Sequence, residues 1–227
     1  MKEKIRKHLP WIIVTSLIAL IPMFIGMALW NRLPEMLPTH FNMEGVVDGY
    51  GSRFDTVVML PLFLLGIHLL CAFACMADPR NFREKAISDG IYRIILMIVP
   101  MVSVFVSVLT YGTAFGWKMN INMIVQLSLG ILFIVIGLFI PRVEQNYTAG
   151  FRLPWTLDDK ENWKKTNKLG GIMMIVCGLL WLVNAFLNIG GSRGFIIILV
   201  VNMVLMLIVP CIYSFMIFVK NKEGETL

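Results

Sequence analysis

Long apolar stretches alternate with short polar connections along most of this chain. Six stretches reach the roughly 20 apolar residues that a helix needs to cross a bilayer. Together they contain no Asp, Glu or Lys, and Arg93, at the edge of the third, is their only Arg. They lack the polar–apolar alternation of barrel strands, and helices satisfy their own backbone groups in hydrocarbon. The predicted transmembrane helices are residues 11–30, 57–77, 91–117, 121–140, 169–188 and 194–219.

Composition supports the same fold class, an all-α integral membrane protein. Hydrophobic residues make up 58% of the 227 residues and charged residues 15%, with a mean hydropathy of +0.77. Soluble domains carry roughly 25% charged residues. The first stretch is longer than the apolar region of a signal peptide, and no cleavage site with small residues follows it. We therefore expect it to remain as the first helix.

The distribution of Lys and Arg predicts the orientation. With the amino terminus inside, the cytoplasmic segments carry sixteen of these residues and the opposite side carries four. This is a strong positive-inside bias, and it places both termini in the cytoplasm. The net charge of +6 is then explained by topology and by contact with anionic lipid headgroups. It requires no direct nucleic-acid partner.

The chain divides into two halves with three predicted helices each. Residues 1–117 contain a long extracellular connection at 31–56, which we call the outer loop. Residues 118–227 contain a long cytoplasmic connection at 141–168, which we call the inner loop. Each long loop follows the first helix of its half, an arrangement that suggests an inverted repeat, although the two halves show no internal sequence similarity.

Few polar side chains lie within the predicted spans. His68, Cys71 and Cys75 share one helix face and offer soft metal ligands, but no fourth ligand is evident, so we predict no metal and no cofactor. A packed or hydrogen-bonded His68 is the favoured interpretation. Side-chain amides stabilise contacts between membrane helices, or alternatively line a substrate path. The amides are Gln126, Asn184, Asn188 and Asn202.

The outer loop carries most of the acidic residues of its side. Turn signals at 42–45 and at 48–49 predict a small hairpin in which residues 39–41 pair with 46–47. This loop is either a compact cap over the helix ends or a binding site. The candidate ligand contacts combine aromatic area with hydrogen-bonding groups, as binding hot spots do. They are His40, Phe41, Asn42, Asp48 and Tyr50.

The inner loop combines turn residues, acids, lysines and tryptophans. Thr156 with Asp159 resembles a capping box, and the lysines at 164–168 suit the carboxyl end of a helix. We predict a short surface helix before the fifth span, with its tryptophans at the membrane interface. The loop is either an anchored connector or a docking surface for a soluble partner. The candidate docking residues are Asn146, Tyr147, Arg152, Trp155 and Trp163.

Two motifs resemble the SdpI family. The first reads Leu-Pro-Thr-His-Phe-Asn at 37–42, then Gly45, Asp-Gly-Tyr at 48–50 and Ser-Arg at 52–53. The second reads Asn-Tyr-x-x-Gly-x-Arg-x-Pro-Trp-Thr-Leu at 146–157, then Trp163, Thr166 and Gly-Gly at 170–171. Asn167 stands where the family pattern has His. The resemblance implies a bacterial plasma-membrane protein that protects its cell from a secreted toxin peptide and sequesters a cytosolic transcriptional repressor.

Three functional classes remain to be compared. The resemblance favours an immunity or peptide-sensing protein. A small membrane transporter or exporter is the alternative, although its spans lack the carboxylates that couple ions. An intramembrane enzyme is disfavoured because the sequence contains no zinc-protease, P-loop or nucleophile-elbow motif.

The predicted orientation is tested by labelling cysteines on intact cells. We expect a membrane-impermeant maleimide to modify Glu44→Cys in the outer loop but to leave Lys160→Cys in the inner loop unmodified. The reverse pattern would overturn the orientation, and equal labelling would contradict the helix count.

Overall fold

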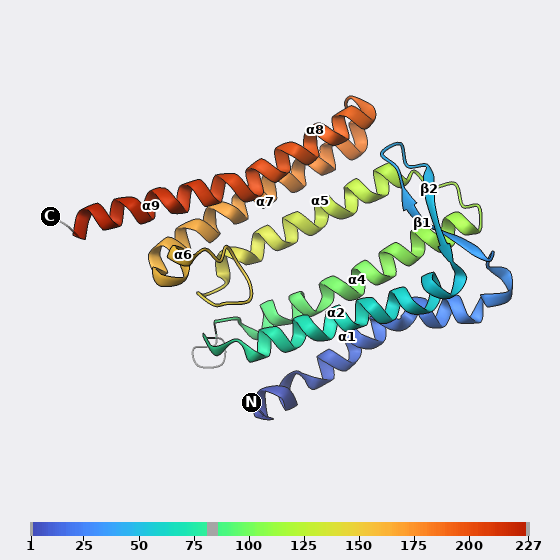
Figure 1. Cartoon of the computed structure of the whole chain (residues 1–227), viewed down its shortest axis with the longest axis horizontal. Helices are drawn as coiled ribbons and strands as arrows, with labels where there is room; N and C mark the ends of the chain where they lie inside the picture. The colour runs from blue at the N-terminus through green and yellow to red at the C-terminus, as the bar shows by residue number, and fades with distance from the viewer. Residues whose placement is uncertain (1, 81–85, 226–227) are drawn as a thin grey trace. The chain divides into compact units, whose positions relative to one another are not determined.

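Six membrane-length helical segments dominate the structure. The computed structural model describes residues 2–80 and 86–225. Within them, six helical segments are long and apolar enough to cross a membrane, and each predicted stretch overlaps one of them, so the predicted fold class is confirmed (Figure 1). The segments are Arg6–Ala28, Asp55–Ala77, Asp89–Ala114, Ile121–Arg142, Lys160–Leu187 and Gly191–Lys222.

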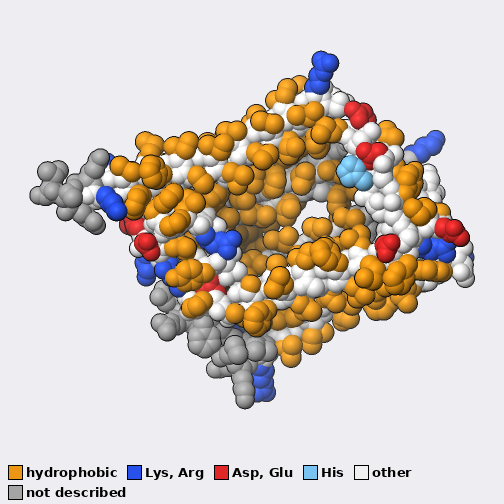
Figure 2. Space-filling view, viewed as in Figure 1, with side chains coloured by type: hydrophobic (Ala, Val, Ile, Leu, Met, Phe, Trp, Pro, Cys, Tyr) orange, Lys and Arg blue, Asp and Glu red, His pale blue; other side chains and the backbone are white. Residues whose placement is uncertain are grey.

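The surface of these helices is apolar along their length. Hydrophobic side chains cover the helices in Figure 2, and the acidic and basic side chains gather towards helix ends and connections. Phe63, Leu70, Phe186 and Met216 are each more than 60% exposed. So many exposed apolar side chains are incompatible with a water-soluble monomer and match a surface that faces lipid.

The chain forms two compact units. The first comprises Met1–Ala77 with Asp89–Ile121, and the second comprises Asp78–Ser88 with Asn122–Leu227. The described residues of the connection after α2, 78–80 and 86–88, therefore belong to the second unit, although they lie between two helices of the first in the sequence.

Three long helices build the first unit, and side-chain hydrogen bonds join them. The Thr15 hydroxyl lies 3.0 Å from Nε2 of His68, so His68 is a hydrogen-bonded side chain between helices. The Ser103 hydroxyl donates to the carbonyl of Ala19. The Tyr111 hydroxyl donates to the carbonyl of Pro22, a proline inside the first helix. The helices are α1 (Lys2–Ala28), α2 (Leu60–Ala77) and α4 (Asp89–Ala114).

A β-hairpin interrupts the first unit between α1 and α2. Strand β1 (Met36–Phe41) pairs antiparallel with β2 (Val47–Ser52), which confirms the predicted hairpin and lengthens it. The predicted second turn at 48–49 is wrong, because His40 pairs with Gly49 and both residues of that dipeptide lie in β2. A 3₁₀ turn, η1 (Trp30–Arg32), precedes the hairpin, and a π-helical turn, η2 (Asp55–Met59), leads into α2.

The second unit is organised around its central helix, α7 (Lys160–Leu187). Helix α5 (Ile121–Phe139) packs against α7 and ends in a 3₁₀ turn, η3 (Ile140–Arg142). The last span combines α8 (Gly191–Met203), a π-helical turn η4 (Val204–Ile208) and α9 (Val209–Glu225), and each part contacts α7.

Two glycine pairs bring α5 and α7 into backbone contact. A Cβ atom on Gly137 would lie 2.6 Å from the carbonyl oxygen of Gly171, and the reverse distance is also 2.6 Å. Seven residues along each helix, a Cβ on Gly178 would lie 2.6 Å from the carbonyl oxygen of Gly130. These distances are far below van der Waals contact, so only glycine permits the approach. Close packing of this kind drives helix association in membranes, where no hydrophobic effect acts between helices.

An amide pair supports the same helix contact. The Asn184 side chain donates to Oε1 of Gln126 at 2.6 Å, and both residues are buried. The prediction that these amides bond between helices is confirmed for this pair. Asn188 instead ends α7 in the left-handed conformation, with φ of 44°. Asn202 contributes its backbone carbonyl, which lies 4.0 Å from Sγ of Cys177.

The predicted surface helix of the inner loop is wrong in its extent. Helix α6 covers Pro154–Asp158 alone, and the lysines at 164–168 lie in the first turns of α7. The Asp159 carboxylate accepts hydrogen bonds from the backbone N–H groups of Glu161 and Asn162, so the acid caps a new helix. Lysines near a helix amino end are unfavourable by dipole alone. Burial of Trp163 and its neighbours under the loop therefore decides where α7 begins.

The glycine contacts predict a sharp difference between glycines of similar sequence context. Gly137→Ala and Gly178→Ala should each lower the free energy of unfolding by about 1–3 kcal/mol, because the added methyl group forces α5 and α7 apart. Gly66→Ala in α2 is the matched control, since a Cβ there meets nothing within 4 Å. Thermal unfolding of the purified protein in detergent measures the difference. Equal stability of all three variants would contradict the close packing.

Candidate functional site

The inner loop is a folded structure closed by buried amides. Asn146 is fully buried and makes four hydrogen bonds within the loop. Its Oδ1 accepts from the backbone of Thr148 and Ala149, each at 2.7 Å, and its Nδ2 donates to the carbonyls of Glu144 and Ala149. A side chain with this complete set of partners shapes the loop and leaves no group for a soluble partner.

Asp78, the first residue after α2, binds the inner loop through its carboxylate, although it lies outside that loop in the sequence. Its Oδ2 accepts hydrogen bonds from the backbone of Tyr147 at 2.6 Å and from the hydroxyl of Thr148 at 2.7 Å. Its Oδ1 accepts from the backbone of Arg80 at 2.9 Å. The residue is 3% exposed, and a buried carboxylate of this kind is stable because charged-group hydrogen bonds replace its water.

Arg80 completes the same contact. Its guanidinium lies 4.7 Å from the centre of the Tyr147 ring, and Nη2 donates to the carbonyl of Leu157 at 2.8 Å. Neither Asp78 nor Arg80 is among the candidate residues predicted from the sequence. The available signal was an Asp-Pro-Arg run directly after an apolar span, in a connection too short to be considered as part of a site.

The inner loop packs on the first turns of α7. Trp163 is 1% exposed and donates from Nε1 to the carbonyl of Val143 at 2.9 Å. Asn167 accepts from the backbone of Phe151 through Oδ1 at 3.0 Å and donates to the carbonyl of Trp163. Asn167, the residue that departs from the family pattern, is thus a loop-holding amide in this chain.

Gly150 is the position where the loop comes closest to α7. Its φ is +117°, a conformation that residues with side chains rarely adopt. A Cβ atom there would lie 2.7 Å from Oδ1 of Asn167 and 2.8 Å from the ring of Trp163. Glycine is therefore required at position 150 for two reasons: its φ angle is rarely adopted by other residues, and there is no room for a Cβ atom.

Trp155 fastens α6 to α9. Its Nε1 donates to the hydroxyl of Ser214 at 3.0 Å, and its ring stacks on Phe218 with centroids 5.8 Å apart. Beside it, Asn162 of α7 donates to the carbonyl of Ser214. These contacts assign Trp155 to anchoring the loop.

Two of the five docking candidates present side chains to the surface. Tyr147 is 48% exposed, and Arg152 is also exposed, with Nη1 bonded to the carbonyl of Tyr147 at 2.7 Å. The structure brings these two together, while Asn146 and Trp163 lie beneath them and Trp155 is half-buried against α9. An exposed aromatic ring beside a positioned guanidinium suits recognition of a protein surface.

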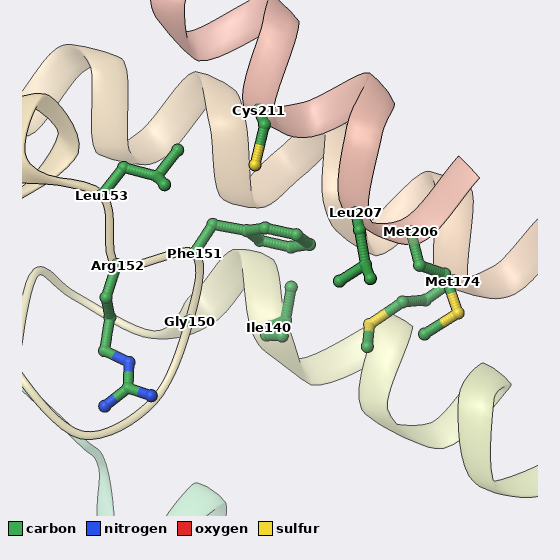
Figure 3. Close-up of a pocket in the computed structure, with 9 residues that line it drawn as sticks. All are labelled: Ile140, Gly150, Phe151, Arg152, Leu153, Met174, Met206, Leu207 and Cys211. Atoms are coloured by element: carbon green, nitrogen blue, oxygen red, sulfur yellow. The ribbon is translucent and has the colours of Figure 1, made fainter. Parts of the chain in front are cut away.

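An apolar pocket of about 310 Å³ lies between the inner loop and the helices of the second unit (Figure 3). The ring of Phe151 projects towards Leu207, whereas the side chain of Arg152 points away from it. At this point the loop therefore directs an aromatic side chain into the pocket and a guanidinium away from it. The pocket is lined by Ile140, Gly150, Phe151, Arg152, Leu153, Met174, Met206, Leu207 and Cys211.

The outer loop presents a second candidate surface, on the first unit. Nδ1 of His40 lies 2.5 Å from Oδ1 of Asp48, and both side chains are exposed. Tyr50 is 60% exposed, and Phe41 is half-buried. Asn42 builds the turn, because its Oδ1 accepts from the backbone of Glu44 and Val46. The hairpin therefore carries three of its five candidate residues on the surface.

The base of the hairpin is attached firmly to the first unit. Leu33, Leu37, Val57 and Tyr111 form a buried apolar cluster there. Arg53 donates to the carbonyls of Trp30 and Pro34, at 2.9 and 3.1 Å. A rigid base with an exposed end gives a binding surface of defined shape. The outer loop as a whole, residues 31–56, contains four carboxylates and two arginines.

The comparisons with known proteins follow the same division of the chain. Residues 142–214 match the SdpI/YfhL protein family, and residues 17–65 match a domain of unknown function (DUF1648). The first match contains nearly all of the inner loop, α7 and most of the last span. The second match contains the end of α1, the whole hairpin and the beginning of α2. No solved structure matches the chain significantly.

A full-length relative agrees with these matches. The chain is 25% identical over 213 residues to the immunity protein SdpI of Bacillus subtilis (strain 168), covering 92% of this chain and 96% of that protein. That relative is named as an immunity protein. The resemblance predicted from the two motifs is confirmed: this chain is similar to the SdpI/YfhL family and to an SdpI immunity protein, and its six apolar helical segments indicate a multi-pass membrane protein.

Proposed function

We propose that this chain is an immunity protein of the bacterial plasma membrane that protects its cell against a secreted toxin peptide. The observation that carries the proposal is the similarity to an immunity protein over nearly the full length of both chains. Similarity confined to one loop would support a shared module, whereas this similarity covers 92% of this chain and 96% of the relative.

The hairpin is the proposed site of toxin recognition. Tyr50 offers a large exposed ring, and the neighbouring His40 and Asp48 offer a hydrogen-bonding pair. Because the base of the hairpin is buried, these side chains are presented without a large entropic cost on binding.

The inner loop is the proposed docking site of a cytosolic repressor. Its exposed face carries Tyr147 and Arg152, and the carboxylate of Asp78 holds the backbone beneath them. A soluble regulator with an acidic surface would complement the excess of Lys and Arg predicted on this side.

Alanine substitution tests the hairpin. Tyr50→Ala should lower the concentration of toxin that kills cells expressing the chain by about tenfold, as loss of a binding hot spot would. Trp117→Ala is the matched control, because Trp117 is 61% exposed in the first unit but lies outside the hairpin. Survival is measured in medium conditioned by the organism that carries this chain, at equal membrane abundance. Full protection by Tyr50→Ala would contradict recognition at this site.

A second substitution separates docking from protection. Arg152→Ala should abolish toxin-dependent recruitment of a cytosolic protein to the membrane while toxin resistance is retained, because the side chain is exposed and donates to the carbonyl of Tyr147 without filling the interior of the loop. Arg142→Ala removes another exposed arginine of the inner loop and should change neither property. Membrane fractionation and survival are measured in the same strains. Loss of resistance at normal abundance would show that the two functions are inseparable.

A further inference from the structure

The two edges of the hairpin differ in what they offer to another chain. Strand β1 packs against α4, and its Leu37 is fully buried. Pro38, in the middle of β1, has no backbone N–H to donate. Proline and burial are two of the devices by which proteins block the edge of a sheet. Strand β1 therefore presents a closed edge.

Strand β2 presents the opposite case. In an antiparallel ladder, successive residues direct their N–H and C=O groups alternately towards the partner strand and away from it. The backbone of Arg53 donates to the carbonyl of Glu35, which sets this alternation. Gly51, paired with Leu37, then faces β1, and Tyr50 faces away. Beyond the ladder, the described residues provide no hydrogen bond to the main chain of Tyr50.

The side chains around β2 leave this edge accessible. Gly49 and Gly51 flank Tyr50, and a Cβ on either would collide with β1, at 2.8 Å from His40 and 2.9 Å from Thr39. The side chains of His40 and Thr39 in β1 therefore occupy the space next to the two glycines. Tyr50, between the glycines, has 60% of its surface exposed. An extended peptide beside β2 would meet the exposed ring of Tyr50 and, at Tyr50, a main chain that has no hydrogen bond beyond the ladder among the described residues.

The charges near β2 indicate which kind of peptide this edge would bind. Asp48 lies within β2 and Asp55 follows it by three residues, whereas β2 itself contains no Lys or Arg. A cationic peptide would be attracted to this edge, and an acidic one would be repelled.

From these observations we propose that β2 binds a cationic peptide in extended conformation as a third strand of the sheet. The main chain of the peptide bonds to Tyr50 and its basic side chains lie near Asp48 and Asp55. Strand addition of this kind takes affinity from main-chain hydrogen bonds and selectivity from side chains. The inference rests on the proposed recognition of a secreted peptide and specifies how the peptide is held.

Strand addition is tested with a synthetic probe. The probe is a short fluorescent peptide in which lysine and valine alternate, and its control is the same peptide with two adjacent central backbone nitrogens methylated, which blocks both edges. Fluorescence anisotropy with the purified full-length chain in detergent measures the affinity. We expect methylation to weaken binding at least about tenfold, as the loss of backbone hydrogen bonds would. Equal affinity of the two peptides, or no binding of the unmethylated peptide, would overturn the proposal.

Two substitutions of Tyr50 test whether the peptide binds at the β2 edge. Tyr50→Pro removes the outward N–H without removing a ladder bond, and Tyr50→Val removes the ring but keeps that N–H. We expect the proline variant to bind the peptide about tenfold more weakly than the valine variant. A disulfide between Met36→Cys and Ser52→Cys, which are paired across the strands, verifies that the hairpin is intact in each background. Equal affinity of the two variants would contradict binding at this edge.

The remaining outcomes separate this proposal from the proposed function. If the chain protects cells from the toxin but binds the methylated and unmethylated peptides equally well, strand addition is rejected and the immunity function is retained. Backbone-dependent binding without protection would reject immunity and retain strand addition. If the native chain is a dimer that Tyr50→Pro converts to a monomer, the edge joins two copies of this chain and the peptide proposal is overturned.

Discussion

The structure of this protein depends on one constraint: every polar group that is removed from water must find a hydrogen-bond partner. In the membrane, helices meet this need internally, which is why the apolar stretches are helical. Between helices the same need selects specific partners, as in the bond from Asn184 to Gln126 and that between Thr15 and His68. Each pair joins two helices whose surfaces are otherwise apolar, and so contributes to their register.

The same constraint explains the inner loop. An irregular segment covered by helices must replace water with side chains, and here Asn146, Asn167 and Asp78 supply the missing hydrogen bonds. The buried Trp163 fills the space beneath them. The result is a loop of fixed shape whose exposed residues, Tyr147 and Arg152, are held at defined positions. A surface of this kind binds a partner without first having to become ordered.

The hairpin obeys the constraint in a different way. Its base is buried and bonded through Arg53, and its closed edge contains a proline. Its open edge leaves the main chain of Tyr50 to solvent, where water satisfies it at little cost. Replacing that water with a peptide strand is favourable only where the peptide also gains side-chain contacts. The fold thus combines a rigid inner loop with an outer strand that remains available.

Sequence alone determined the membrane class, the six spans, the hairpin and the family resemblance, because hydrophobic length, turn residues and motif spacing are local properties. It also identified Arg152 and Tyr50 among the candidates. Tertiary structure decided the rest. Asp78 and Asn146 lie 68 positions apart in the chain, and their shared role depends on packing that no local pattern encodes. The start of α7 at Lys160, against the preference of its lysines, follows from the burial of Trp163. The glycine contacts between α5 and α7 likewise exist only once two helices meet, since a glycine within one helix carries no sign of what approaches it.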